Sequence, residues 1–398
     1  MSLVDRKSQF QTSWPTVGFA VYLGILAAAH IGKVPPALLQ IREELSLSLG
    51  SGGLVVSMFS IVGMVAALAL GITSDRISQR TSIGLGIFCL TIGGVSGALS
   101  NGFGTLLASR AIEGLGFIAI ATAAPGVVSR LASNADRPFA MGIWSSFMPI
   151  GFATGVCLSA VLLQFYDWRV VWISLAGIIA ISGLLILRTF PKTSNYEEKI
   201  PFKKIRIILI RPSNWGLSIA FGAYAFQWIT VMVWLPSFLT SDMGISILQA
   251  SIATAVVVTV NIPGNIFGGA LLGAGWCPFK LVAGSGATMA ITCAYFFSDP
   301  FDSPILILAS VLIFSFVAGT IPATLFASAA NGQKESLGIA NGMLMQGSAI
   351  GQFLGPPLIG AVVAYNSYNW SAAAIPLVLA SGLTVVLVAK ATKSTFNQ

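Results

Sequence analysis

Four ionisable side chains stand inside otherwise apolar stretches of this 398-residue chain: His30, Lys33, Arg110 and Glu113. His30 and Lys33 are three residues apart, as are Arg110 and Glu113, so each pair shares one face of a helix. An arginine fork and a lysine point charge suit the binding of a carboxylate or a phosphate. Histidine and glutamate side chains can take up and release a proton. Together the four residue types predict a site for an anion and a proton.

The segments that carry these residues must be membrane helices. Hydrophobic residues make up 55% of the chain and charged residues only 9%, whereas soluble domains carry about 25% charged residues. The apolar runs are about 20 to 25 residues long, which is the length that a helix needs to cross a bilayer. Twelve such runs are expected, near 15–38, 52–71, 82–100, 105–128, 139–163, 170–187, 215–239, 247–270, 280–297, 305–328, 337–364 and 371–389. The predicted fold class is an all-α membrane protein with twelve transmembrane helices.

The distribution of basic residues predicts the orientation of these helices. With a cytoplasmic N-terminus, only Arg42 and Arg169 fall in loops on the outer side, and the other loop residues with a positive charge face the cytoplasm. We therefore expect both termini in the cytoplasm and a multi-pass protein of the plasma (inner) membrane. The net charge of +8 follows from this orientation, so no nucleic-acid partner is expected. The first apolar run is too long for a signal-peptide core, so no cleavage is expected.

The two halves of the chain are related by an offset of two hundred residues. The offset aligns Pro36 with Pro236, Gly151 with Gly351 and Gly155 with Gly355. We expect an N-terminal six-helix bundle (1–187), a cytoplasmic basic linker (188–212) and a C-terminal six-helix bundle (213–398). The KKIRIILIR part of the linker is typical of a basic amphipathic helix on an anionic membrane surface, although a plain linker fits equally well.

Two motifs show a family resemblance. GITSDRISQR (71–80) resembles the G-x-L-A-D-R-x-G-R-R loop of the major facilitator superfamily, and its matching residues are Gly71, Asp75, Arg76 and Arg80. LLASRAIEGLG (106–116) resembles that family's L-x-x-x-R-x-x-Q-G-x-G motif, with Glu113 in place of glutamine. Ser78 and Gln79 depart from the first motif, the segment 268–280 lacks its aspartate, and the fifth span lacks the full G-P-x-x-G-G pattern associated with antiporters in the family.

The resemblance implies two parallel six-helix repeats around a central site, with alternating access to its two sides. It also implies that spans one, four, seven and ten line the cavity. His30, Lys33, Arg110 and Glu113 would then meet in one cluster in the outer half of the pathway. The loop residues Gly71, Asp75, Arg76 and Arg80 would act in gating.

Uncharged groups of the second half are candidates for holding the neutral part of a substrate. Tyr224, Gln227 and Trp228 share one face of the seventh span, and Gln346 lies on the eleventh. Simpler interpretations of the charged residues stay open. Arg110 and Glu113 can form a structural brace, Lys33 can extend to the outer interface, and His30 can pack with a single hydrogen bond. Trp228 can likewise be an ordinary packing aromatic.

The sequence thus predicts a secondary transporter that moves a small organic anion, with proton symport. The alternatives are an exporter of a drug or a metabolite such as a siderophore, and a membrane sensor. An enzyme is not expected, because one histidine and one carboxylate at membrane depth do not make a catalytic set. No nucleotide-binding motif, metal or cofactor is expected. The expected partners are the substrate, protons and the lipid bilayer, and we expect a monomer.

Overall fold

The computed structural model describes residues 11–73, 78–133, 136, 140, 143–144, 146–189, 206, 208–298, 303–330 and 337–396. These residues form helices and their connections, and no strand occurs among them. Asp75 and Arg76, and linker residues 190–205 and 207, lie outside the described residues. The prediction for those two gating residues, and part of the predicted linker helix, therefore fall outside the described part of the chain.

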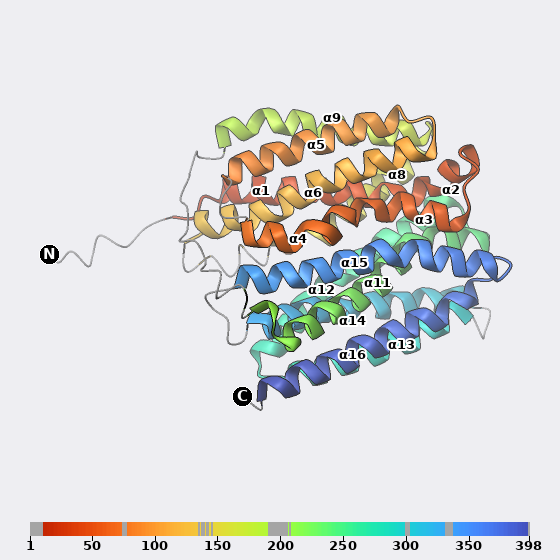
Figure 1. Cartoon of the computed structure of the whole chain (residues 1–398). Helices are drawn as coiled ribbons and strands as arrows, with labels where there is room; N and C mark the ends of the chain where they lie inside the picture. The colour runs from red at the N-terminus through yellow and green to blue at the C-terminus, as the bar shows by residue number, and fades with distance from the viewer. Residues whose placement is uncertain are drawn as a thin grey trace.

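The first half contains four helical segments that are long and apolar enough to cross a membrane and two shorter apolar helices, which together make its six spans. Figure 1 shows how they are arranged. The first span consists of α1 (Trp14–Gly32) and α2 (Val34–Glu44), and the second of α3 (Leu49–Ser57), η2 (Met58–Ser60) and α4 (Ile61–Thr73). The remaining spans of this half are α5 (Gln79–Ala98), α6 (Phe103–Leu131), α8 (Phe147–Leu162) and α9 (Trp168–Thr189).

The second half also contains six spans. They are α11 (Pro212–Ser241), α12 (Ile247–Gly273), α13 (Pro278–Ser298), α14 (Pro304–Ala330), α15 (Leu337–Tyr365), and η4 (Trp370–Ala373) with α16 (Ala374–Phe396). Over the whole described chain, ten helical segments are long and apolar enough to cross a membrane, and α8 and α9 contribute two shorter apolar stretches. The predicted all-α membrane fold is confirmed.

The first span is broken at the position of the candidate site. Pro35 and Pro36 have no amide hydrogen, so the hydrogen-bond ladder of α1 ends at Gly32. Lys33 is both the C-cap of α1 and the N-cap of α2. The break therefore fixes the backbone of Lys33 between two helices.

Glycines at corresponding positions of the two halves bring equivalent helices together. A Cβ atom at Gly151 of α8 would lie 2.3 Å from the Ile25 carbonyl oxygen of α1, and one at Gly351 of α15 would lie 1.9 Å from the Gly222 carbonyl oxygen of α11. Only a residue without a side chain allows such an approach. The predicted repeat is thus visible in the helix packing, because α8 packs on α1 as α15 packs on α11.

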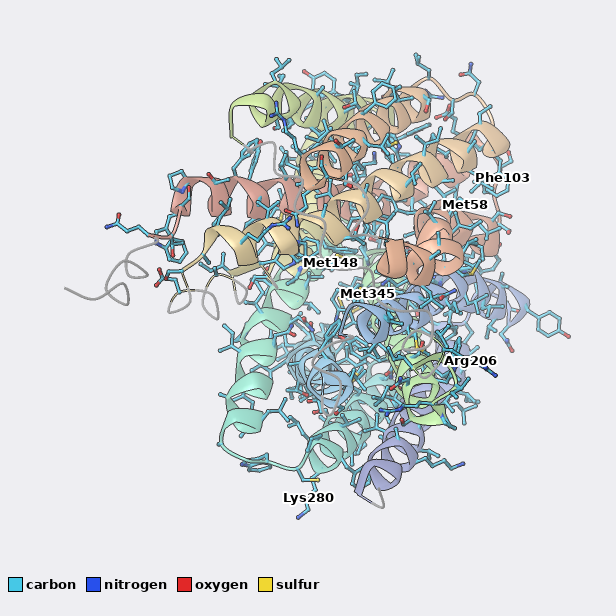
Figure 2. The ribbon with its side chains drawn as sticks, turned by 60° about the vertical axis from the view of Figure 1, so that its left-hand side comes forward. Met58, Phe103, Met148, Arg206, Lys280 and Met345 are labelled. Carbon is cyan, nitrogen blue, oxygen red and sulfur yellow. The ribbon has the colours of Figure 1, made fainter. Side chains whose placement is uncertain are left out.

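The two halves meet along several pairs of helices. The pairs are α2 with α11 and α12, α3 and α4 with α15, and α8 with α12. Side chains fill the space between the halves, with Met58 of η2 on one side of the boundary and Met345 of α15 on the other (Figure 2). The start of α1 and the end of α16 lie at the same end of the molecule (Figure 1).

Candidate functional site

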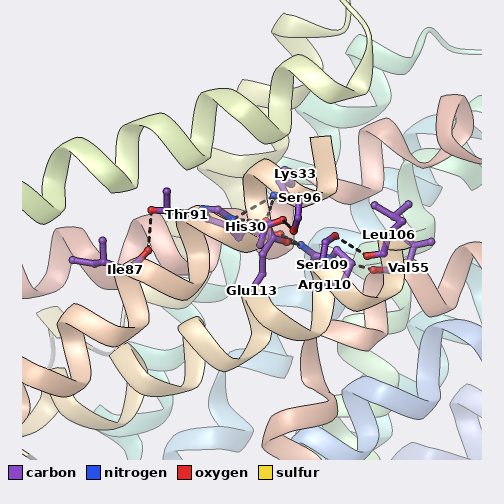
Figure 3. Close-up of polar contacts among 11 residues, drawn as sticks. His30, Lys33, Val55, Ile87, Thr91, Ser96, Leu106, Ser109, Arg110 and Glu113 are labelled. Atoms are coloured by element: carbon purple, nitrogen blue, oxygen red, sulfur yellow. Dashed lines mark hydrogen bonds and ion pairs between the residues drawn. The ribbon is translucent and has the colours of Figure 1, made fainter. Parts of the chain in front are cut away.

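Glu113 is the common acceptor of a fully buried cluster of four side chains (Figure 3). Its Oε1 atom lies 2.5 Å from Lys33 Nζ and 2.9 Å from His30 Nδ1, and its Oε2 atom accepts a hydrogen bond from Arg110 Nη1. His30 Nδ1 also lies 3.3 Å from Lys33 Nζ. All four side chains have 0% exposure. We call these residues, His30, Lys33, Arg110 and Glu113, the charged cluster.

The first half holds Arg110 in one orientation. Arg110 Nε donates to the Val55 carbonyl oxygen at 3.1 Å, and Nη1 donates to the His30 carbonyl oxygen at 3.0 Å. The guanidinium carbon lies 4.8 Å from the centre of the Phe59 ring, a distance at which cations are attracted to aromatic faces. Arg110 therefore links its own helix, α6, to the first span and to the second span.

Lys33 is held by a second set of contacts. Its Nζ atom lies 4.3 Å from the ring centre of Trp172 on α9, and its carbonyl oxygen accepts a hydrogen bond from Ser159 Oγ on α8 at 2.9 Å. Trp172 packs edge-on against Trp168, whose Nε1 atom donates to Glu44. The alternative in which Lys33 extends to the outer interface is wrong, because the side chain is completely buried.

Two buried polar atoms of the charged cluster have no hydrogen-bond partner among the described residues. They are His30 Nε2 and Arg110 Nη2. Buried polar atoms in native structures nearly always have a partner. An arginine N–H group without a partner can donate a hydrogen bond to an incoming carboxylate or phosphate. The formal charge of the cluster is +1 with His30 neutral, which also suits an anion.

The four candidate residues of the second half have different neighbours. Trp228 packs against Phe152 of α8 with ring centres 6.2 Å apart, and its Nε1 atom has no partner among the described residues. A Cβ atom at Gly32 would lie 2.0 Å from the Phe152 carbonyl oxygen, so Phe152 joins Trp228 to the chain segment beside Lys33. Tyr224 stacks on Phe221 at 5.8 Å.

The two glutamines have structural partners. Gln227 Oε1 accepts a hydrogen bond from Ser381 Oγ of α16 at 2.7 Å, so this side chain faces the interior of the second half. Gln346 Nε2 donates to the Met64 carbonyl oxygen of α4 at 2.9 Å, so it links the two halves. Of the residues predicted to hold the neutral part of a substrate, Trp228 is the one that packs against a first-half residue next to the charged cluster.

The described gating residues lie at the ends of two helices. Gly71 is in the last turn of α4, and Arg80 is the second residue of α5. Ser78, which departs from the family motif, is the N-cap of α5, because its Oγ atom accepts a hydrogen bond from the Thr81 amide at 3.2 Å. Serine is one of the residues preferred at the N-cap of a helix, because its hydroxyl oxygen can accept a hydrogen bond from a free backbone amide of the first turn.

Phe59, Ser159 and Trp172 support the charged cluster, yet the sequence does not single them out. Each lies in an apolar run, where an aromatic or small hydroxyl residue is usually an ordinary packing residue. The one available signal is the spacing of Trp168 and Trp172, which places two tryptophans on the same face of α9.

Comparison with known proteins decides the family. The model of the Major Facilitator Superfamily matches residues 18–356. The chain belongs to this superfamily. The family prediction is therefore confirmed, and the chain is a multi-pass membrane protein of this superfamily, whose matched relatives are named as transporters and not as enzymes.

Several relatives and solved structures are similar to this superfamily member. The hexuronate transporter of Bacillus subtilis (strain 168) is 24% identical over 64% of the chain, and the match spans 63% of that relative. The probable L-galactonate transporter of Escherichia coli (strain K12) is 22% identical over 80% of the chain and 76% of that relative. A bacterial homolog of the human lysosomal transporter Spinster, in an inward-facing and occupied conformation, matches with a TM-score of 0.73 and 17% identity over 96% of this chain and 95% of the other. The last comparison concerns the fold alone.

Proposed function

We propose that this chain is a secondary active transporter that moves a small organic anion together with a proton by alternating access. The observation that carries the proposal is the shared acceptor: Glu113 binds His30, Lys33 and Arg110 in one fully buried cluster. Ionisable groups at membrane depth are costly and mark substrate and proton pathways. In this cluster the groups suited to an anion and those suited to a proton touch one another.

Competition for the two cations gives a mechanism of coupling. Glu113 occupies Lys33 Nζ and Arg110 Nη1 in the structure. An entering carboxylate can bind Arg110 Nη2, which has no partner among the described residues, but it competes with Glu113 for Lys33 Nζ and for the second prong of the Arg110 fork. A proton on Glu113 removes its negative charge and releases both donors for the substrate. Proton and anion then enter together, and the formal charge of the buried cluster stays at +1.

His30 lies on the path of that proton. Its Nδ1 atom is within hydrogen-bond distance of Glu113, and its Nε2 atom has no partner among the described residues. A ring with one nitrogen on the acceptor and the other free can pass a proton from one side to the other. His30 is therefore the proposed relay and Glu113 the proposed proton acceptor.

The names of two relatives support an anionic substrate. Hexuronates and galactonates are sugar acids that carry a carboxylate, and these words stand in the names of proteins that match 64% and 80% of this chain. We assign Arg110 and Lys33 to the carboxylate, and Trp228, with Tyr224, to the neutral part. Gln346, Gly71, Asp75, Arg76 and Arg80 are assigned to gating. We further propose a monomer in the plasma (inner) membrane, with both termini in the cytoplasm.

The test is uptake into proteoliposomes with an imposed pH gradient. The panel contains glucuronate, galactonate, other carboxylates, organic phosphates and cationic drugs. We expect accumulation of at least one sugar acid or other organic anion when the interior is alkaline, and none without the gradient. Accumulation of cationic drugs alone, or uptake of anions that never exceeds equilibrium, would contradict the proposal.

Three variants test the assignment of the proton. Glu113→Gln and His30→Gln should each abolish accumulation against the gradient while counterflow exchange continues. Glu43→Gln is the matched control, because Glu43 is an exposed carboxylate at the end of α2 and should transport like the unmodified protein. If both cluster variants still accumulate the anion, then the proton does not travel through this cluster.

A further inference from the structure

A cavity lies in the second half and is not lined by any residue of the charged cluster. The helix ends that line it are at the end of the molecule opposite to the end of α16 (Figure 1). The cavity has a volume of about 440 Å³ and is lined by the last turn of α11, the end of α13, the start of α14 and the turn before η4. Asp242, Phe238 and Phe297 belong to its wall, together with Ile307 and Asn369. Nothing in the proposed transport mechanism uses these residues.

Asp242 is a carboxylate without a counter-cation. It caps the C-terminus of the 30-residue helix α11, where its amide donates to the Phe238 carbonyl oxygen at 3.0 Å. The C-terminus of a helix carries partial negative charge, which repels a carboxylate and attracts a cation. Within the described part of the chain Asp242 forms no ion pair, and Ser241 is its only side-chain hydrogen-bond partner. Partial burial raises the pKa of the Asp242 carboxyl, as expected for an acid whose charge is uncompensated.

Two aromatic rings line the same cavity as this carboxylate. The Phe238 and Phe297 rings meet edge to face with their centres 5.4 Å apart. Phe297 also lies nearly parallel to Trp370, at 6.4 Å and an interplanar angle of 9°. The rings are thus fixed by their packing, and two of them form part of the cavity wall.

A chain of hydrogen bonds joins the aromatic group to the carboxylate. Trp370 Nε1 donates to Ser241 Oγ at 3.0 Å, and Ser241 Oγ donates to Asp242 Oδ1 at 3.0 Å. This chain fixes the direction of the carboxylate relative to the rings. A carboxylate held beside aromatic faces is the combination that recognises an organic cation, because both attract positive charge.

We propose that this cavity binds a small organic ammonium ion, with the cationic nitrogen between Asp242 and the Phe238 and Phe297 rings. A metal ion fits less well, because a hard cation needs six or more oxygen ligands. No group of three potential metal-ligating side chains occurs in the described residues. The ammonium group can belong to a free solute or to the headgroup of a lipid, since both present the same chemistry. The inference does not depend on the transport of an anion.

Binding of benzyltrimethylammonium and of choline to the purified full chain, measured by calorimetry in dodecyl maltoside without lipid, tests the proposal. Asp242→Asn keeps the shape and removes the charge, so it should raise the Kd by about tenfold or more. Phe297→Leu should raise it by about threefold, which corresponds to the loss of one cation–π contact. Glu43→Gln is the control and should leave the Kd unchanged. Glu43 is an exposed carboxylate near the end of α2, and α2 ends on the side of the molecule away from the end of α16 (Figure 1).

The proposal is overturned if the unmodified protein does not bind either cation, or if Asp242→Asn binds as tightly as the unmodified protein. Ser241→Ala is a second variant that keeps Asp242 but removes its hydrogen bond, and it should weaken binding even if the Asn variant unfolds. Nanodiscs distinguish the two sources. A lipid headgroup would compete, so the apparent Kd would be higher in phosphatidylcholine than in an uncharged galactolipid, whereas a site for free solutes would give equal values in these two lipids of zero net charge.

Discussion

Lys33 and Glu113 form a completely buried ion pair between the first and fourth membrane spans, with Nζ and Oε1 2.5 Å apart. Lys33 gains a second contact from the face of Trp172, and Glu113 gains two further partners from His30 and Arg110. Because desolvation of a charge costs several kcal/mol, such a pair is stable only when all its members are present. The same ion pair therefore contributes to the stability of the fold and takes part in the proposed transport mechanism.

Removal of the single acid should destabilise the protein more than removal of an acid and a base together. Glu113→Gln leaves Lys33 and Arg110 buried without an anion, and we expect a loss of about 3–5 kcal/mol. The double variant Lys33→Met with Glu113→Gln should recover part of this loss, because one uncompensated charge disappears. Thermal unfolding in detergent measures both. A double variant that is less stable than Glu113→Gln would contradict this account.

Arg110→Lys tests whether the planar fork matters. The substitution keeps the charge but cannot donate to Val55, to His30 and to an anion at the same time. We expect the KM for the anion to rise about tenfold or more, which is about 1.4 kcal/mol, with normal membrane insertion. Uptake kinetics in proteoliposomes measure the effect. An unchanged KM would leave Arg110 with only the structural role of a brace.

The meeting of the charged residues could be predicted from sequence by combining helical geometry with the resemblance to the superfamily, which implies that spans one and four line the same cavity. Spacings of three residues place His30 with Lys33 and Arg110 with Glu113 on single helical faces, and antiparallel spans bring the two pairs to the same depth. What the spacing cannot give is the pattern of contacts. That Glu113 would be the shared acceptor follows from the rotation of α6 about its axis, which only the packing determines.

The second half shows where such reasoning ends. Gln227 lies at the middle of the seventh span, yet its side chain is bound by Ser381 within its own half. Gln346 is also a candidate substrate ligand from the sequence, and in the structure its amide donates to the Met64 carbonyl oxygen of the other half. A helix that is apolar on all sides has no polar face to indicate its orientation. The face of α11 or α15 that is turned to the first half therefore could not be deduced.

Gly93 should be essential for the position of Glu113. A Cβ atom at Gly93 of α5 would lie 2.6 Å from Glu113 Cγ and 2.9 Å from the Glu113 amide nitrogen. Gly93→Ala should therefore destabilise the protein by about 1–3 kcal/mol through overpacking and should reduce transport as well. Gly84 is the control on the same helix, because nothing lies within 4 Å of a Cβ atom there.

The two glycine variants separate packing from helix propensity. Gly84→Ala should be neutral or stabilising by about 0.5–1 kcal/mol, since alanine favours a helix more than glycine does. Thermal unfolding of the two variants, measured side by side, gives the comparison. Equal stability of the two would show that Glu113 can move aside freely.

Gln346 should help to hold the two halves together in the conformation described here. Its amide donates to the Met64 carbonyl oxygen on α4 at 2.9 Å, and Gln352 Oε1, nearly two helical turns further along α15, accepts a hydrogen bond from Ser60 at 3.3 Å. Gln346→Met keeps the length of the side chain and removes the donor. The loss of one hydrogen bond is worth about 0.5–1.5 kcal/mol, which should shift the population severalfold toward a conformation in which α4 and α15 separate.

Spin labels at Val65 of α4 and Leu354 of α15, both of which are exposed on the surface of the described chain, report the separation by pulsed electron resonance. Gln346→Met should increase the fraction of long distances. Gln164→Met is the matched control, because Gln164 donates to the Ala160 carbonyl oxygen within the first half and spans no boundary. Its distance distribution should equal that of the unmodified protein. An unchanged distribution in Gln346→Met would mean that the bond to Met64 does not bias the conformational equilibrium, and the close packing of Gly53 on Pro356 would then be the contact that holds α3 and α4 against α15.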